Sequence, residues 1–184
     1  MRLSPYAPIL MLLLLSGCAT SGVRREFEAL PLLTPAALGM STASQQRLTL
    51  SRDTGAAMLT IDAAIEVDAE ELRVAGLLLG QRVLLLTWNG KDLRESREPV
   101  VPASLEGRAI LRDLQLTYWP AEAIRAALPH GWRLKEDGMR RQLYHGMTLV
   151  LESERGDAIP LGEAALWNHV GHYRIDIEAS HESG

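Results

Sequence analysis

The feature that most constrains the fold is an alternation of apolar and polar residues over residues 57–68. This period of two is typical of a β-strand with one buried face and fits the 3.6-residue period of a helix poorly. The apolar set is Leu59, Ile61, Ala63, Ile65 and Val67, and the polar set is Thr60, Asp62, Glu66 and Asp68. We therefore predict a strand whose acidic side chains lie on a solvated outer face.

Three neighbouring segments continue the strand pattern. Residues 71–78 and 81–88 predict two more strands, and Asn89-Gly90 predicts a tight hairpin turn because both residues tolerate positive φ. Residues 91–97 are the expected return strand. Residues 83–86 are apolar on both faces, which predicts that both sides of the sheet are covered there.

The hydrophobic period changes in the centre of the chain. Residues 108–118 carry apolar side chains at helical spacing, and Pro120 favours the first turn of a second helix over residues 120–128. Strands are again predicted over residues 132–136, 139–144, 147–152 and 173–178. This order predicts an α+β fold in which a long antiparallel curved sheet, a half-barrel, holds a two-helix insertion as plug or lid. The plan is similar to that of the outer-membrane lipoprotein acceptor of the Lol pathway.

A leader precedes the predicted domain. Arg2 is followed by an apolar run over residues 7–15, which has the length of a signal-peptide core and is too short to span a membrane. Leu15-Ser16-Gly17-Cys18 is similar to the lipobox of bacterial lipoproteins at all four positions. The resemblance implies cleavage before Cys18 and stable anchoring through acyl chains on it, whereas Ala19, in place of an aspartate, implies an outer-membrane location facing the periplasm. The expected organisation is a signal peptide over 1–17, a lipidated tether over 18–43 and a single domain over 44–184.

A second resemblance rests on the centre of the chain. The run Ile110-Leu111-Arg112-Asp113-Leu114-Gln115-Leu116-Thr117-Tyr118-Trp119-Pro120 is followed by residues 123–128 and by Gly131-Trp132. With Leu77, Gly80, Arg82, Gly171, Tyr173 and Ile175, these residues resemble a family of bacterial lipoproteins whose genes lie beside aryl-polyene biosynthesis enzymes. The resemblance spans roughly residues 48–177. It implies a role in the assembly, transport or outer-membrane insertion of a polyene lipid, and it transfers no catalytic residues.

Composition and motifs exclude several classes of function. The formal net charge of −4 argues against a general nucleic-acid binder, and a single cysteine excludes an intrachain disulfide and a Cys-based zinc cluster. The chain has no Gly-x-Ser-x-Gly elbow and no Gly-rich phosphate-binding motif. His169 and His172 have i, i+3 spacing, but a metal would need a third ligand such as His145. We therefore expect no catalysis, no metal and no cofactor.

The tryptophans and the helix faces are the remaining candidates for a binding site. Each Trp stands at the end of a predicted element, which suits both the corner of a core and the mouth of a pocket. The candidate residues for the lining of a ligand cavity are Trp88, Ile110, Leu111, Leu114, Tyr118, Trp119, Ile124, Leu128 and Trp132.

Two function classes follow from these observations. In the first, the protein binds or hands over an acyl or polyene-type chain, or a lipidated cargo, without catalysis. In the second, it is a membrane-anchored scaffold that docks a periplasmic or membrane protein partner. An apolar hollow of ~300 Å³ or more favours the carrier, and a core at native packing density favours the scaffold.

Overall fold

The computed structural model describes residues 22–52, 55–101, 106–156 and 160–179, and most of its regular structure is β. The strands are β1 (Thr42–Arg52), β2 (Ala57–Val67), β3 (Leu72–Leu78), β4 (Gln81–Trp88), β5 (Leu93–Arg97), β6 (Trp132–Asp137), β7 (Arg140–His145), β8 (Thr148–Arg155), β9 (Ala164–Asn168) and β10 (Tyr173–Ala179). The helical segments are residues 22–28, the 3-10 helix η1 (Pro35–Leu38), α2 (Gly107–Tyr118) and α3 (Ala121–Ala127).

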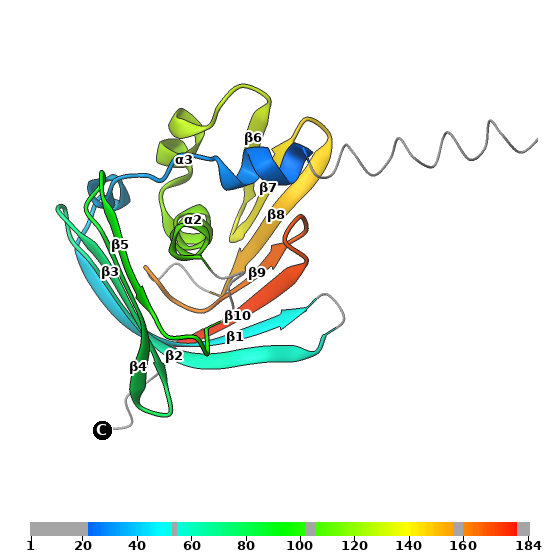
Figure 1. The fold of residues 1–184 in the computed structure, drawn as a ribbon. Coiled ribbons are helices and arrows are strands. Elements are labelled where there is room, and N and C mark those ends of the chain that lie inside the picture. The colour runs from blue at the N-terminus through cyan, green and yellow to red at the C-terminus, as the bar shows by residue number, and fades with distance from the viewer. Residues whose placement is uncertain (1–21, 53–54, 102–105, 157–159, 180–184) are drawn as a thin grey trace, which may run out of the picture.

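All ten strands form one antiparallel sheet with the order β5-β4-β3-β2-β1-β10-β9-β8-β7-β6. Each half of the chain forms a meander, and the halves join where β1 pairs with β10. The sheet is open, with β5 and β6 at its edges, and it curves around α2 (Figure 1). Register shifts in the pairs β1–β2, β3–β4 and β7–β8 favour this curvature. The predicted long antiparallel curved sheet with a helical insertion is therefore confirmed.

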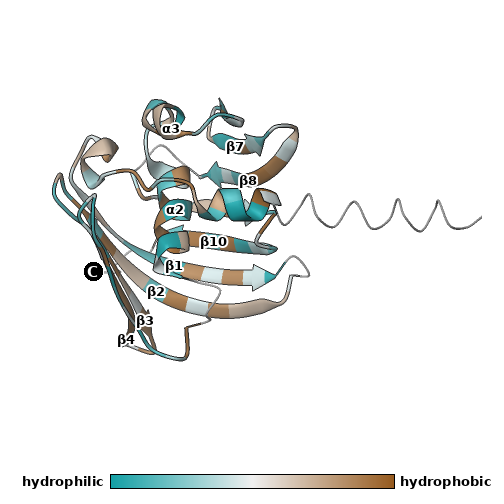
Figure 2. Ribbon diagram, turned by 45° about the horizontal axis from the view of Figure 1, so that its top comes forward, coloured by the Kyte–Doolittle hydropathy of each residue, from teal (hydrophilic) through white to brown (hydrophobic). Residues whose placement is uncertain are grey.

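Eight of the ten strands coincide with segments predicted from alternation, and β1 and β9 were not predicted. In β1, the inward-facing Gln46 is fully buried and its Nε2 donates a hydrogen bond of 2.6 Å to the carbonyl oxygen of Leu161. A polar side chain at a core-facing position hides the alternation. In other strands the alternation is clear, and Figure 2 shows hydrophobic and hydrophilic residues alternating along β2 and β10.

The segment before β1 belongs to the folded body. Phe27, Leu30 and Leu38 are buried in the same core as the strands, and the Arg112 guanidinium lies 3.8 Å from the centre of the Phe27 ring. The side-chain amide of Gln115 accepts a hydrogen bond from the Leu33 N–H and donates one to the Leu33 carbonyl, both at 2.8 Å. The described part of the predicted tether is thus packed against α2.

α2 lies inside the curve of the sheet and is enclosed along most of its length. Every residue from 111 to 119 is buried. The helix ends at Trp119, whose backbone is extended (φ −64°, ψ 152°) because the following Pro120 disfavours the helical conformation. α3 begins directly after Pro120, so the two predicted helices are confirmed together with the corner between them.

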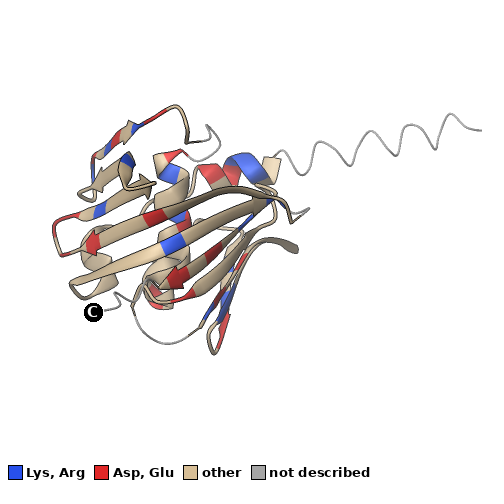
Figure 3. Ribbon diagram, turned by 90° about the horizontal axis from the view of Figure 1, so that it is seen from below, with Lys and Arg blue, Asp and Glu red and all other residues tan. Residues whose placement is uncertain are grey.

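The outer face of the sheet is solvated. Lys, Arg, Asp and Glu residues are scattered along the strands (Figure 3), and some pair across strands, as Arg47 does with Asp62 at 3.0 Å. In the described part of the chain, the helices lie on the inner side of the sheet (Figure 1), so none of them provides the second cover predicted over residues 83–86. The register shift in β3–β4 leaves Val83 without a partner residue on β3, and Leu85 stays half-buried. Among the described helices, none has the length and apolar character needed to span a membrane.

Candidate functional site

An apolar cavity lies between α2 and the concave face of the sheet. Its volume is about 90 Å³. Its wall is built from alternate residues of β1, β2, β3, β4 and β10, and α2 contributes Ile110 and Leu114. The half-buried aliphatic members of the wall are Leu48, Leu59, Ile61, Ile110, Ile175 and Ile177. Aliphatic side chains that stay partly accessible inside a concave surface are typical of a site for an apolar ligand.

A buried polar chain forms one wall of this cavity. The Gly171 N–H donates to Asn168 Oδ1 at 2.7 Å, and Asn168 Nδ2 donates to the Tyr173 hydroxyl at 2.8 Å. The Tyr173 hydroxyl in turn donates a very short hydrogen bond to Asp113 Oδ2. The Arg112 guanidinium completes the chain, with an Nη2 to Asp113 Oδ1 distance of 3.3 Å.

Burial sets the protonation state of Asp113 and Tyr173 in this hydrogen-bonded network. It raises the pKa of Asp113 above its ordinary value, although the charge of Arg112 and the hydrogen bonds oppose the shift. Burial also raises the pKa of Tyr173, and the neighbouring Asp113 carboxylate adds to the effect. Tyr173 therefore remains a protonated donor over the physiological pH range. The chain forms a satisfied structural network at the border of the cavity.

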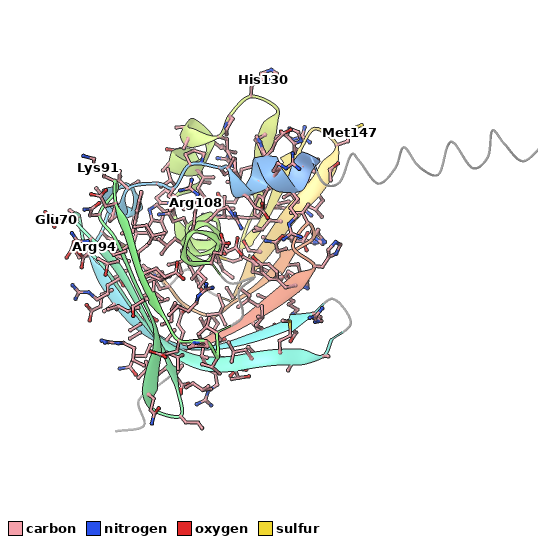
Figure 4. All side chains as sticks on the ribbon, viewed as in Figure 1. Glu70, Lys91, Arg94, Arg108, His130 and Met147 are labelled. Carbon is pink, nitrogen blue, oxygen red and sulfur yellow. The ribbon has the colours of Figure 1, made fainter. Side chains whose placement is uncertain are left out.

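A second, larger cavity adjoins the first. Its volume is about 470 Å³, and it shares Leu50 and Tyr173 with the apolar cavity. Its apolar lining includes Phe27 and Met58. Its charged lining comprises Arg24, Glu28, Arg52, Glu106, Arg108 and Arg112, with His172 beside them. Figure 4 places Arg108, in the first turn of α2, within the curve of the sheet, whereas the other labelled side chains lie at the periphery.

The structure distributes the predicted cavity residues over several places. Only Ile110 and Leu114 line the apolar cavity. Leu111 is fully buried in the core, whereas Ile124 and Leu128 line a separate cavity of about 20 Å³. Tyr118 is buried, and its hydroxyl donates a hydrogen bond of 2.6 Å to the carbonyl of Gly162.

The three tryptophans proposed for the cavity instead hold the N-terminal segment. Trp88 Nε1 donates to the Leu33 carbonyl at 2.7 Å, and Trp119 Nε1 donates to the Thr34 carbonyl at 3.2 Å. The Trp132 ring packs against Phe27, with 6.1 Å between ring centres. None of the three lines either of the two larger cavities. Cys18, the predicted lipidation site, lies outside the described residues.

Sequence reasoning missed the residues that build most of the site. The inward positions of β10, Tyr173, Ile175 and Ile177, were visible as an alternating set, but their partners on β1 were not. Arg52 and Arg108 had no signal in the sequence, because only the pairing of distant segments brings them to one cavity. Within residues 22–179, apart from the gaps named above, no three His, Cys, Asp or Glu side chains cluster as metal ligands.

Comparison with known proteins places the chain in a family. A search of curated proteins finds no match to the chain. A protein-family model matches residues 43–181, which run from the second residue of β1 past the end of β10 and so include the strands that line both cavities. Because the match covers well over half of the chain, the protein belongs to the family described as Protein of unknown function (DUF3261).

Proposed function

We propose that this protein is a periplasm-facing lipoprotein of the outer membrane, anchored through Cys18, that binds or hands over an acyl or polyene-type chain without catalysis. The hydrocarbon would lie between the concave face of the sheet and α2. In this reading the curved sheet acts as a half-barrel with the helices as its lid, in the manner of the Lol-pathway acceptor. The resemblance to lipoproteins encoded beside aryl-polyene enzymes favours a polyene lipid as the ligand.

The observation that carries the proposal is the half-buried aliphatic wall of the apolar cavity. Leu48, Leu59 and Ile177 come from the neighbouring strands β1, β2 and β10, and they lie side by side on one wall of the cavity without being fully buried. Leaving such surface in contact with water is unfavourable, at roughly 25 cal/mol per Å². A hydrocarbon chain would remove that contact, and each methylene buried would contribute about 0.8 kcal/mol.

The volume of the cavity requires a movement of the lid or an extension of the ligand. Pockets for ligands of drug size hold roughly 300–1,000 Å³, and the apolar cavity holds about 90 Å³. The adjoining cavity of about 470 Å³ provides room for the rest of a ligand. An outward shift of α2 would widen the apolar part further.

A binding assay with a fluorescent fatty-acyl probe tests the proposal. The Leu48→Glu change places a charge on the half-buried wall and should weaken probe binding at least tenfold while the sheet stays folded. The matched control is Leu79→Glu, because Leu79 is 96% exposed in the β3–β4 turn and lines neither cavity. Equal loss of binding in both variants, or no binding by the wild-type protein, would refute the proposal.

The small apolar volume also favours a second candidate, a membrane-anchored scaffold that docks a protein partner. Such a partner would meet the outer face or the helices rather than the edges. The edge strand β5 carries Arg94, Glu95 and Arg97, and charged edges discourage the addition of another strand. A protein that binds no hydrocarbon but cross-links in cells to one partner would support this second role.

A further inference from the structure

The larger cavity carries a charge opposite to that of the protein. Four arginines and two glutamates line it, whereas the whole chain has a formal net charge of −4. Two of these arginines already have partners, since Arg24 pairs with Glu28 at 2.8 Å and Arg112 pairs with Asp113. The other two arginines, Arg52 and Arg108, are therefore the candidates for binding a ligand.

Arg52 and Arg108 are exposed to the cavity and to solvent. Neither forms an ion pair with any residue of the described ranges, and Arg108 donates one hydrogen bond, of 2.8 Å, to the Leu30 carbonyl. A guanidinium offers five donors in a planar fork that matches carboxylate and phosphate oxygens. Each of these side chains therefore keeps donors for an anion, and only Glu106 opposes them in the lining once the paired residues are set aside.

The two cavities form a polar compartment and an apolar compartment that meet. They share Leu50 and Tyr173, and the chain from Arg112 through Asp113 to Tyr173 stands between them. The larger cavity is itself amphipathic, because Phe27 and Met58 lie in the same lining as the arginines. A ligand with a hydrocarbon tail and an anionic head matches this arrangement from end to end.

We propose that the two cavities are one site for a single-chain anionic amphiphile, which deepens the proposed function and rests on it. The tail lies under α2, and the carboxylate or phosphate head binds Arg52 and Arg108. A cationic head would meet like charges there, and a neutral head would leave the two guanidinium groups without a counter-ion.

The position of the N-terminal helix places this site near the proposed anchor. Arg24, Phe27 and Glu28 of the helix over residues 22–28 line the larger cavity. The six residue-to-residue steps from Cys18 to Arg24 span at most roughly 20 Å even when fully extended. In an acylated protein, the head-group compartment therefore stays close to the bilayer surface, where anionic amphiphiles enter and leave.

Calorimetric titration of the full chain with three matched ligands tests the proposal. Laurate, dodecyl phosphate and dodecanol share one tail and differ in the head, and each is used below its aggregation limit. We expect laurate and dodecyl phosphate to bind roughly tenfold or more tightly than dodecanol, since hydrogen bonds to a charged group are strong. Acetate and inorganic phosphate, which lack the tail, should not compete at the same concentrations.

The Arg52→Gln, Arg108→Gln double variant should lower the affinity for laurate to that for dodecanol and leave dodecanol binding unchanged. Arg52→Gln alone should show an intermediate loss, which guards against a folding defect at Arg108. Arg94→Gln on the exposed edge strand β5 is the matched control and should change nothing. Equal wild-type affinity for laurate and dodecanol would overturn the head-group site but leave the proposed function standing. Failure of all three ligands to bind would overturn both, and competition by free phosphate would assign the site to a free anion.

Discussion

Arg141 provides the sharpest test of how the helical insertion is held. Its guanidinium is almost completely buried, and one Nη donates to three carbonyls at the end of α2, those of Leu116 (3.2 Å), Thr117 (2.9 Å) and Trp119 (2.7 Å). Its Nε donates to Glu136 Oε1 at 2.7 Å. One side chain thus satisfies carbonyls that a helix end leaves without partners, and it places positive charge at the negative end of the helix dipole.

Arg141→Met removes all of these contacts at once. The three buried carbonyls would lose this donor, and Glu136 would keep, among the described residues, only Arg155 at 3.4 Å. Leaving several buried acceptors unpaired costs about 3–5 kcal/mol in total. For a chain of this length, that loss lowers the melting temperature by roughly 6–20 °C. Urea unfolding followed by circular dichroism measures the loss of unfolding free energy, and a thermal scan measures the shift in melting temperature.

The adjacent Arg140 is the matched control for this experiment. It lies on the opposite face of β7 with its side chain 54% exposed, and it pairs with Glu152 at 2.8 Å. Because Glu152 keeps the hydrogen bond from Gln142 at 2.6 Å, Arg140→Met should change the unfolding curve far less than Arg141→Met. A loss below about 1 kcal/mol for Arg141→Met would refute the reasoning, because the end of α2 would then be satisfied without the guanidinium.

Three further predictions concern packing, pH and anchoring. Gly107→Ala should destabilise the protein by about 1–3 kcal/mol, because the new Cβ would lie 2.6 Å from Leu86 Cδ2. This change usually stabilises a helix, so a raised melting temperature would contradict the prediction. The backbone N–H of Glu71 donates to Asp68 at 2.7 Å and helps to lower the pKa of Asp68. Asp68→Ala should therefore reduce stability at pH 7 and have less effect as the pH falls below about 4, where the carboxyl becomes protonated. Urea titrations at pH 7 and below about pH 4 measure the difference. Cys18→Ala should abolish labelling by radioactive palmitate, and wild-type labelling of that variant would refute the lipid anchor.

The sequence pattern predicted most of the sheet because most of its strands alternate apolar inward residues with polar outward residues. In β2, Leu59, Ile61 and Ile65 face the interior and the acidic residues face solvent, as the alternation requires. β1 was not predicted because its inward Gln46 is polar, and the side-chain nitrogen of Gln46 donates to a backbone carbonyl 115 residues away. No local sequence pattern predicts a buried amide whose partner is so distant. The strand that joins the two halves of the sheet was therefore found only in the structure.

The candidate site was predictable only in part for the same reason. The apolar stripe of α2 identified Ile110 and Leu114, which do line the cavity. Helical periodicity also selected Leu111, but it cannot distinguish a face that meets a cavity from one that meets a packed core. The tryptophans misled because a large indole at the end of an element serves equally well to hold a neighbouring segment, as Trp88 and Trp119 hold the backbone of residues 33 and 34.

The central claim is that hydrocarbon occupies the space between α2 and the sheet. Native mass spectrometry of the purified full chain, followed by fragmentation of any bound species, tests it most directly. We expect a bound molecule with an aliphatic or polyene chain and an acidic head, which is lost in the Leu48→Glu variant and retained in Leu79→Glu. A protein that carries no such molecule, and takes up none when laurate or dodecyl phosphate is added, would contradict the account.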